Sequence, residues 1–415
     1  MNDTALSSYV MDASTQIDYQ PTYRDKYRRT LTTIKVFSNP VINKNIRDYQ
    51  RKHNPTKAVR ECGDYPIFGK DVSLCDYGGS RLTFTGVSRC NNTLCWDCYH
   101  SVRMKKAKII ERALRSITDN QGSKLFFITL TTSRYADPSD VLDIQNKALN
   151  SVFGNFKKKL VEVGIRKEGI GTIKALDWTI HPGGKFPFHN HFHCLLSFED
   201  KDDKINDIWV SNYFKDKWTQ YINKKGKRYG INAVRVAQDI QRSYSINAAV
   251  ARYLVKQKGL SLEIAMGGNK NSSQGFSFPE FMILASQHPT DRRLVNIYKT
   301  LARVLKGRQI VRIDSVMKEY AGQYDGDQDE VKEPLHKMTF CSNLYEALVS
   351  MGSRYHIKNI MFEYWRHNRC SREAQSLISL AAGSLIRRRS VVEWIIYLAG
   401  TTYDRRKRSK EVAIC

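Results

Sequence analysis

A run of alternating histidines constrains this chain more than any other stretch of its sequence. His189-Asn190-His191-Phe192-His193 leads into the apolar residues 194–198, which predicts a strand that enters a core. Because side chains alternate along a strand, His191 and His193 project from one face while their apolar neighbours pack on the other. Two imidazoles at this spacing are natural ligands for a divalent metal. The alternative is a surface strand that carries histidines without a ligand.

The histidine strand has a predicted partner just before it in the chain. Residues 170–180 form a strand pattern, and His181-Pro182-Gly183-Gly184 then turns the chain. The histidine strand is therefore expected to return antiparallel beside residues 170–180, which brings Asp177 close to His191 and His193. One carboxylate and two imidazoles suit Mg²⁺ or Mn²⁺, with coordination positions left open for substrate oxygens.

The charge of the chain indicates its class of partner. In 415 residues, 67 lysines and arginines against 41 acidic residues give a formal net charge of +26. Such a field attracts polyanions, so nucleic acid is the expected partner and an anionic membrane or a ribosomal partner is the alternative. No stretch approaches the ~18–20 apolar residues that span a bilayer. No secretory signal is apparent at the N-terminus. We therefore expect a cytoplasmic protein without a membrane partner.

The cysteines predict a second metal site. Without a signal peptide, nine cysteines favour metal binding over disulfides. The tightest cluster is Cys90, Cys95 and Cys98, and a tetrahedral structural zinc site needs a fourth ligand. Cys62, Cys75 and His100 are the candidates for that ligand, and we adopt Cys75. The alternative is a set of buried free thiols.

The remaining pattern predicts an α+β fold with a central antiparallel sheet and flanking helices. A buried strand is predicted at 125–132 and another strand at 231–236, with helices at 101–117, 141–163, 209–221, 245–259 and 278–286. The predicted regions are a polar, basic N-terminal arm (1–60), a Cys-rich module with a basic helix (61–120), a central domain (121–300), a connecting segment with an acidic linker (301–334), a helical C-terminal domain (335–403) and a basic tail (404–415).

Four pieces in this order resemble the rolling-circle replication initiators of small plasmids, which belong to the HUH endonuclease superfamily. The pieces are the cysteine cluster, a strand ending in Thr129-Leu130-Thr131, the histidine strand preceded by Asp177, and the helical stretch Arg252-Tyr253-Leu254-Val255-Lys256. The resemblance covers about residues 85–290, and it implies that residues 121–300 are the endonuclease domain.

This resemblance implies that Tyr253 attacks a phosphodiester of single-stranded origin DNA. A 5′-phosphotyrosyl link would form and a 3′-hydroxyl would be freed for a polymerase. Asp177, His191 and His193 would hold the catalytic Mg²⁺ or Mn²⁺, which a phenol with a pKa of about 10 needs for this attack. Lys256 would stabilise the phosphate or orient Tyr253, and His189 would have a role other than ligand. Implied partners are origin DNA, a host helicase and polymerase, and a second copy of the chain, in a prokaryotic cell that carries the plasmid or virus.

The chain departs from this family at one position. Plasmid relatives often carry a glutamate four residues before the tyrosine, where this chain has Ala249. Termination would then need another base or a tyrosine from a second protomer. A transposase of the same superfamily would use the same residues on a different DNA. A conjugative relaxase fits less well, because Tyr253 follows the histidine strand. The alternative from another class is a non-catalytic, zinc-containing nucleic-acid-binding protein.

Overall fold

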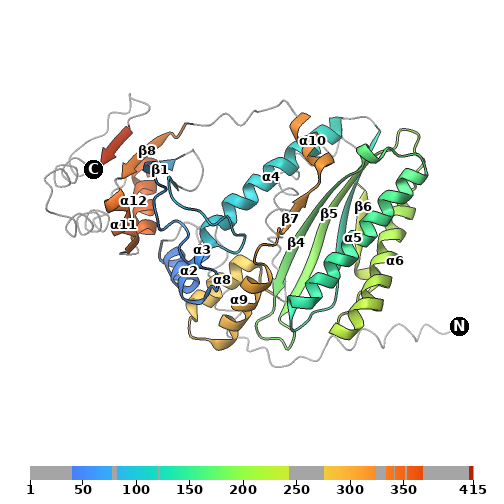
Figure 1. Ribbon diagram of the computed structural model, residues 1–415, viewed down its shortest axis with the longest axis horizontal. Coiled ribbons are helices and arrows are strands. Elements are labelled where there is room, and N and C mark those ends of the chain that lie inside the picture. Colours follow the sequence, from blue (N-terminus) through green and yellow to red (C-terminus); the bar gives the residue numbers. More distant parts are fainter. Residues whose placement is uncertain are drawn as a thin grey trace.

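The computed structural model describes residues 40–76, 82–119, 122–242, 275–323, 333–340, 342–350, 353–367 and 411–414. Within these ranges the chain is an α+β protein with two sheets and flanking helices, as the sequence predicts (Figure 1). The larger sheet has the strand order β6-β3-β5-β4-β7, and all its neighbours are antiparallel. Its strands are β3 (Ser123–Thr131), β4 (Gly171–Ile180), β5 (Phe188–Glu199), β6 (Asp239–Arg242) and β7 (Val311–Ile313).

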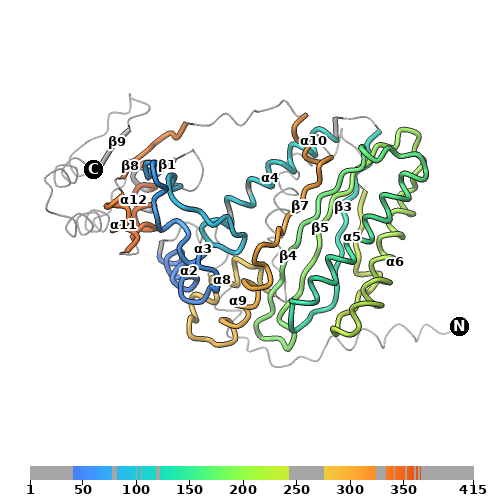
Figure 2. Tube along the Cα trace, viewed as in Figure 1, coloured from blue at the N-terminus to red at the C-terminus, as the bar shows by residue number. Residues whose placement is uncertain are grey.

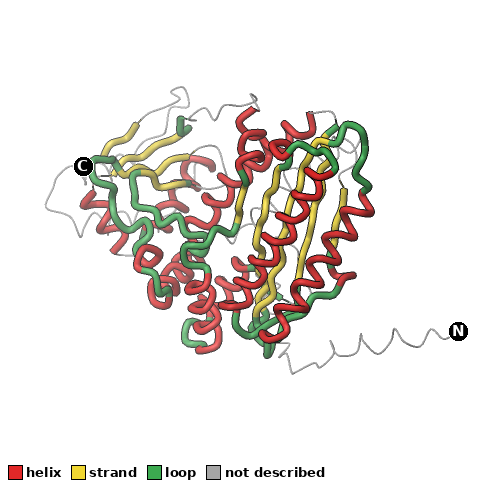
Figure 3. Tube along the Cα trace, turned by 45° about the vertical axis from the view of Figure 1, so that its right-hand side comes forward, coloured by secondary structure: helices red, strands yellow, loops and turns green. Residues whose placement is uncertain are grey.

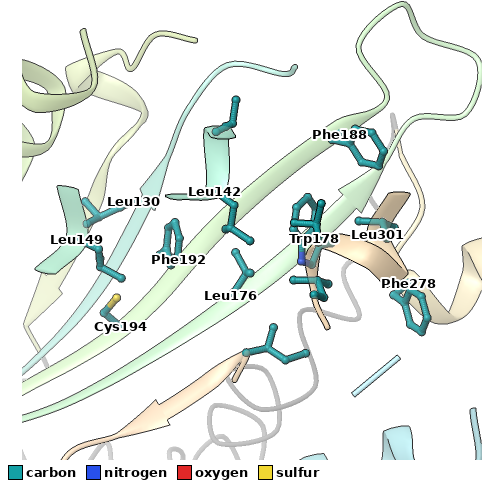
Figure 4. Packing of buried hydrophobic residues seen from close by; sticks show 14 of the residues in the cluster. Leu130, Leu142, Leu149, Leu176, Trp178, Phe188, Phe192, Cys194, Phe278 and Leu301 are labelled. Atoms are coloured by element: carbon teal, nitrogen blue, oxygen red, sulfur yellow. The ribbon is translucent and has the colours of Figure 1, made fainter. Parts of the chain in front are cut away.

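One face of the larger sheet is covered by two long helices, α5 (Pro138–Glu162) and α6 (Asp207–Gly226) (Figures 1 and 3). Asp137 caps α5 by accepting a hydrogen bond from the Ser139 backbone, so the helix begins where the Asp-Pro-Ser sequence predicts. Phe192 and Cys194 of β5 point into the core beneath these helices, together with Leu142 and Leu149 of α5 (Figure 4). The core continues at one end of the sheet into α8 (Phe278–Gln287) and α9 (Arg292–Val304).

The opposite face is covered along part of its length by α4 (Trp96–Asp119) and α10 (Ser315–Gln323). Ile110 and Leu114 of α4 pack against Ile173 and Leu195 of the sheet. Further along the same strands, this face carries polar and histidine side chains instead of aliphatic ones. The change in side-chain character divides the face into a core half and a polar half.

The smaller sheet has the order β2-β1-β8-β9 and is antiparallel except for the parallel pair β8–β9. Its strands are β1 (Val72–Asp76), β2 (Thr83–Thr85), β8 (His336–Phe340) and β9 (Glu411–Ile414). Phe84 of β2, Phe340 of β8 and Tyr345 of the following helix form its aromatic core. The predicted Cys-rich and C-terminal regions therefore share one sheet. The helices that pack against this sheet are α11 (Ser342–Ser350) and α12 (Arg354–His367).

Two local structures differ from the sequence prediction. Within the predicted N-terminal arm, α2 (Pro40–His53) and α3 (Lys57–Arg60) are helices, and α2 lies beside α8 (Figure 2). The inner side of α2 carries the buried polar residues Arg47 and Gln50 beside Ile46, which weakens the hydrophobic periodicity.

The predicted strand at 231–236 is wrong. This stretch ends in a 3₁₀ turn, η5 (Arg235–Ala237), because Val234 and Val236 are exposed and have no core to face. The remaining short 3₁₀ turns are η3 (Lys167–Gly169) and η4 (Lys227–Tyr229). The predicted helix at 245–259, most of the acidic linker and most of the chain after residue 367 lie outside the described residues. None of the described helices is long and apolar enough to cross a bilayer.

A buried charge network joins α12 to the start of α4. Arg354 donates to the Asp97 carboxylate at 2.7 Å and to the Gly63 carbonyl at 2.8 Å. Tyr355 donates to the other Asp97 oxygen at 2.7 Å, and Arg47 of α2 lies 3.4 Å from Asp97. Burial alone would raise the pKa of Asp97, but Arg354, Arg47 and Arg89 hold it well below its usual value. The carboxylate thus stays ionised and ties three segments together.

We expect Arg354→Met to lower the free energy of unfolding by about 3–5 kcal/mol, because it leaves a buried carboxylate short of a partner. Arg166→Met is the matched control, since Arg166 pairs with Glu199 at 2.8 Å while its own side chain is 75% exposed. The control should cost no more than about 1 kcal/mol. Urea unfolding of the two variants measures both values, and equal losses would contradict the role of the network.

Candidate functional site

The register of three strands assembles the polar half of the sheet. β5 lies between β3 and β4, so each of its histidines has one neighbour on each side. His191 is opposite Thr131 of β3 and Asp177 of β4. His193 is opposite Thr129 of β3. The sequence prediction that a hairpin brings Asp177 to the histidines is confirmed by this pairing.

His193 is held in one orientation by three contacts. Its Nδ1 lies 3.2 Å from the Thr129 hydroxyl, and its ring stacks on Phe127 with 5.8 Å between centroids. Its Nε2 lies 3.9 Å from Oδ2 of Asp177. The side chains of His193 and Asp177 are 12% and 17% exposed, so both reach the surface. Metal-binding histidines usually have one ring nitrogen held by a hydrogen bond, which fixes the ring and leaves the other nitrogen for the metal.

The three histidines form a row along β5. His191 lies nearly parallel to His193 at 6.2 Å between ring centroids, and edge-on to His189 at 4.4 Å. Among the described residues, the ligand atoms of Asp177, His191 and His193 are not all within 4.8 Å of one another. One ion bound by all three would therefore require rotation of at least one side chain.

His189 has contacts of a different kind. Its Nε2 lies 3.0 Å from the Thr132 carbonyl and 3.1 Å from the Thr131 hydroxyl. Because a carbonyl only accepts, Nε2 carries a proton and donates it. Burial and nearby Arg134 lower the pKa of His189, so the ring is neutral near pH 7. In this tautomer Nδ1 is the unprotonated nitrogen, so the expected role of His189 outside the ligand set stays a prediction.

Sequence reasoning missed the roles of Thr129 and Thr131. Each hydroxyl meets a histidine across the β3–β5 pair, Thr129 with His193 and Thr131 with His189. The signal was available in the alternation of threonines at the end of β3, which matches the alternation of histidines in β5. Only the register decides which threonine meets which histidine.

Tyr253 and Lys256 lie outside the described residues, in segment 243–274. The segment leaves β6 at Arg242, and β6 pairs with β3 on one side of the histidine strand. It returns at Phe276, which pairs with Ile180 of β4 on the other side. A Cβ on Gly275 would come within 2.4 Å of the Thr179 side chain, so the chain returns in close contact with that strand. Phe276 thus rejoins the sheet beside β4.

A second cluster consists of four cysteine thiols from three segments. Cys62 follows α3, Cys90 follows β2, and Cys95 and Cys98 lie at the start of α4. All four sulfur atoms lie within 4.8 Å of one another, as the ligands of one metal ion would. Bonds with the other three thiols lower the pKa of Cys62, and sharing protons with Cys62 raises the pKa of those three.

The prediction that Cys75 is the fourth ligand of the cysteine cluster is wrong. Cys75 lies within β1, where its Sγ is 3.7 Å from the Thr85 hydroxyl. Cys62 takes the fourth position, with its Sγ 3.4 Å from Sγ of Cys98. Spacing did not reveal this, because the chain folds back from α3 onto the start of α4.

The helix α4 connects the cysteine cluster to the polar half of the sheet. Tyr99 directly follows Cys98, is 3% exposed, and packs against Phe278 at 5.6 Å between ring centroids. Burial raises the pKa of Tyr99 to about 12, and the nearby Asp177 carboxylate contributes to that rise. Tyr99 therefore remains a neutral phenol close to Asp177. The position of Tyr99 beside Asp177 depends on how the start of α4 is held by the cysteine cluster and the charge network.

No protein-family model, curated protein or solved structure matches this chain.

We expect Cys62→Ser to reduce the divalent metal bound per chain, whereas Cys75→Ser should leave it unchanged. The physical reason is that only Cys62 places its sulfur among the other three. Co²⁺ titration, followed by thiolate-to-metal absorption, measures the difference directly. If the Cys75 variant lost the absorption and the Cys62 variant kept it, the cluster would be assigned wrongly.

Proposed function

We propose that the protein is a metal-dependent DNA nicking and joining enzyme that starts rolling-circle replication at a plasmid or viral origin. The observation that carries this proposal is the arrangement of His191, His193 and Asp177 on neighbouring antiparallel strands, with His193 oriented by Thr129. Two imidazoles and one carboxylate at the surface of a rigid sheet fit a divalent cation that also contacts a substrate. The formal net charge of +26 supports a nucleic-acid substrate.

The donor set fits Mg²⁺ or Mn²⁺, and Asp177, His191 and His193 would hold the ion. When bound, the ion polarises the scissile phosphate and stabilises the charge that develops on it. Nε2 of His193 is the atom that already faces Asp177. The Thr129 hydroxyl keeps Nδ1 of the same ring engaged, so the ligand nitrogen is selected before an ion arrives.

Tyr253 is the proposed nucleophile. Its phenol oxygen attacks phosphorus and forms a phosphotyrosyl bond to the 5′ side of the break. The bond between phosphorus and the 3′ oxygen breaks, and that oxygen takes up a proton and leaves as the 3′-hydroxyl. Lys256, three residues on, would hold its ammonium near the phosphate. Because one phosphodiester replaces another, the reverse attack rejoins the strand without ATP.

Zinc is the proposed occupant of the cysteine cluster. Four thiolates in a tetrahedral set form a closed site, and closed sites are structural rather than catalytic. The buried Asp97 lies between Cys95 and Cys98 in the sequence and binds Arg354 and Tyr355. The ion would therefore stabilise the same start of α4 that the charge network holds.

The non-catalytic alternative explains the cysteines and the charge but leaves the histidine row without a purpose. A structural role would account for one histidine paired with Asp177, but it does not call for two imidazoles beside the same carboxylate. We therefore favour the enzyme, with DNA as substrate and a host helicase, a host polymerase and a second copy of the chain as partners.

We expect Tyr253→Phe to bind single-stranded DNA like the wild type but to form no covalent adduct, because it lacks the attacking oxygen. Tyr244→Phe is the matched control, as the other tyrosine of segment 243–274, and should retain the adduct. The measurement is a denaturing gel of purified protein with labelled DNA of its own element, with and without Mn²⁺. Retention of the adduct in Tyr253→Phe would remove Tyr253 from the mechanism. Tight, salt-sensitive binding without any adduct in the wild type would favour the non-catalytic alternative.

We expect Thr129→Val to raise the Mn²⁺ concentration needed for half-maximal nicking by about 10- to 100-fold, because the variant loses the bond that orients His193. His189→Gln should raise it less than Thr129→Val does, since the proposed ligands are Asp177, His191 and His193. Nicking rates over a Mn²⁺ series test the order. A larger effect of His189→Gln would place His189 in the ligand set.

A further inference from the structure

Two cations face each other across the pair β4–β7, on the sheet face opposite the histidines. Lys174 of β4 is directly opposite Arg312 of β7. Both point toward α5: the Lys174 ammonium lies 3.4 Å from the Asn150 side-chain oxygen and 4.7 Å from the Phe153 ring centroid. The Arg312 guanidinium donates to the Asn146 side-chain oxygen at 2.6 Å. Like charges placed directly opposite each other in a sheet are destabilising.

The neighbouring carboxylates are already paired with other cations. Asp314 accepts from Lys157 at 3.0 Å, and it also accepts from the backbone and hydroxyl of Thr172. Asp143 accepts from Arg308 at 2.7 Å. Among the described residues, the contacts of Lys174 and Arg312 with acceptors are those to amide oxygens. The cluster therefore has an excess of positive charge.

The charge excess is partly shielded from water. Burial lowers the pKa of Lys174, Arg312 and Lys157 lower it further, and nearby Asp314 offsets part of this decrease. Burial also lowers the pKa of Arg312. Cys194, opposite Lys174 on the other side, is a neutral thiol, since burial raises its pKa to about 12. The fold thus holds two cations together at a cost, and within the described residues neither cation donates a hydrogen bond to a carboxylate.

The flank of α5 above this pair has room for a ligand. Asn146, Asn150 and Gly154 follow one another at helical spacing on that flank. A Cβ placed on Gly154 would meet no atom within 4 Å, so the space beside it is open. A phosphate group would fit here, because two cationic donors and two side-chain amides lie beside an open space.

We propose that Lys174 and Arg312 form a phosphate-binding site, and that its phosphate comes from the backbone of a bound nucleic acid. Lys174 and Asp177 are three residues apart on β4 and on opposite faces, so about 10 Å of strand separates them. In this proposal, one nucleic-acid strand passes around the β7 edge of the sheet and contacts both sites. The assignment to nucleic acid rests on the proposed function, whereas the anion site does not.

The test is Asn150→Asp, which places a carboxylate next to Lys174 without altering either strand. In chloride buffer, this variant should melt at a higher temperature than the wild type, because it relieves the repulsion. Inorganic phosphate should raise the Tm of the wild type, by about 2 °C, more than chloride of equal ionic strength does. The variant should lose this specific increase.

Asn155→Asp is the matched control, because it makes the same charge change on another flank of α5, where residue 155 is exposed. The control should keep the phosphate-specific increase in Tm. Equal phosphate effects in the wild type and Asn150→Asp would overturn the site. A lower Tm of Asn150→Asp in chloride would overturn the repulsion argument and the site with it.

The source of the phosphate is tested by binding in a Tyr253→Phe background, where no nicking interferes. Asn150→Asp should reduce the slope of log affinity against log salt for single-stranded DNA by about 0.7 per lost phosphate contact. An unchanged slope together with a lost phosphate effect on Tm would assign the site to free phosphate and overturn the nucleic-acid source. Failure of the wild type to form an adduct would bear on the proposed nicking alone.

Discussion

The antiparallel register of β5 with β3 and β4 is the constraint on which the rest of the structure depends. It sends Phe192 and Cys194 into the core under α5 and α6 while the histidines face the other way. A shift of the register by one residue would exchange the two faces, burying imidazoles under the helices and exposing aromatic rings. The large apolar area on one face therefore fixes the geometry of the polar site on the other.

The cysteine cluster and the charge network around Asp97 constrain α4 from its first turn. Cys95 and Cys98 belong to the cluster, and Asp97 between them binds Arg354 of α12. From this anchored end, α4 presents Tyr99 near Asp177 and then packs along the sheet with Ile110 and its neighbours. The chain thus connects its C-terminal region to the candidate site through one rigid helix. If the cysteines bind a metal, its removal would change the position of α4 and of Tyr99 beside the candidate site.

The positive charge of the chain is used in two different ways. Arg47 and Arg354 are buried, donate hydrogen bonds to backbone carbonyls and lie beside the Asp97 carboxylate, so they stabilise the fold. Lys174 and Arg312 are placed opposite each other, and in the described part of the chain their hydrogen bonds go to amide oxygens. The first pair of cations is neutralised within the fold, whereas we propose that an external phosphate neutralises the second. This contrast separates structural cations from cations that are available for binding.

Local sequence determined the strands of the histidine hairpin, the long helices and the start of α8, because periodicity, Asp-Pro caps and the Ser277 capping box act over a few residues. It also brought Asp177 to the histidines, since one short turn joins their strands. The fourth cysteine, the support of His193 by Thr129 and the pairing of Lys174 with Arg312 depend on segments far apart in the chain. Their register and packing are decided by burial of the whole core, and only the tertiary structure determined them.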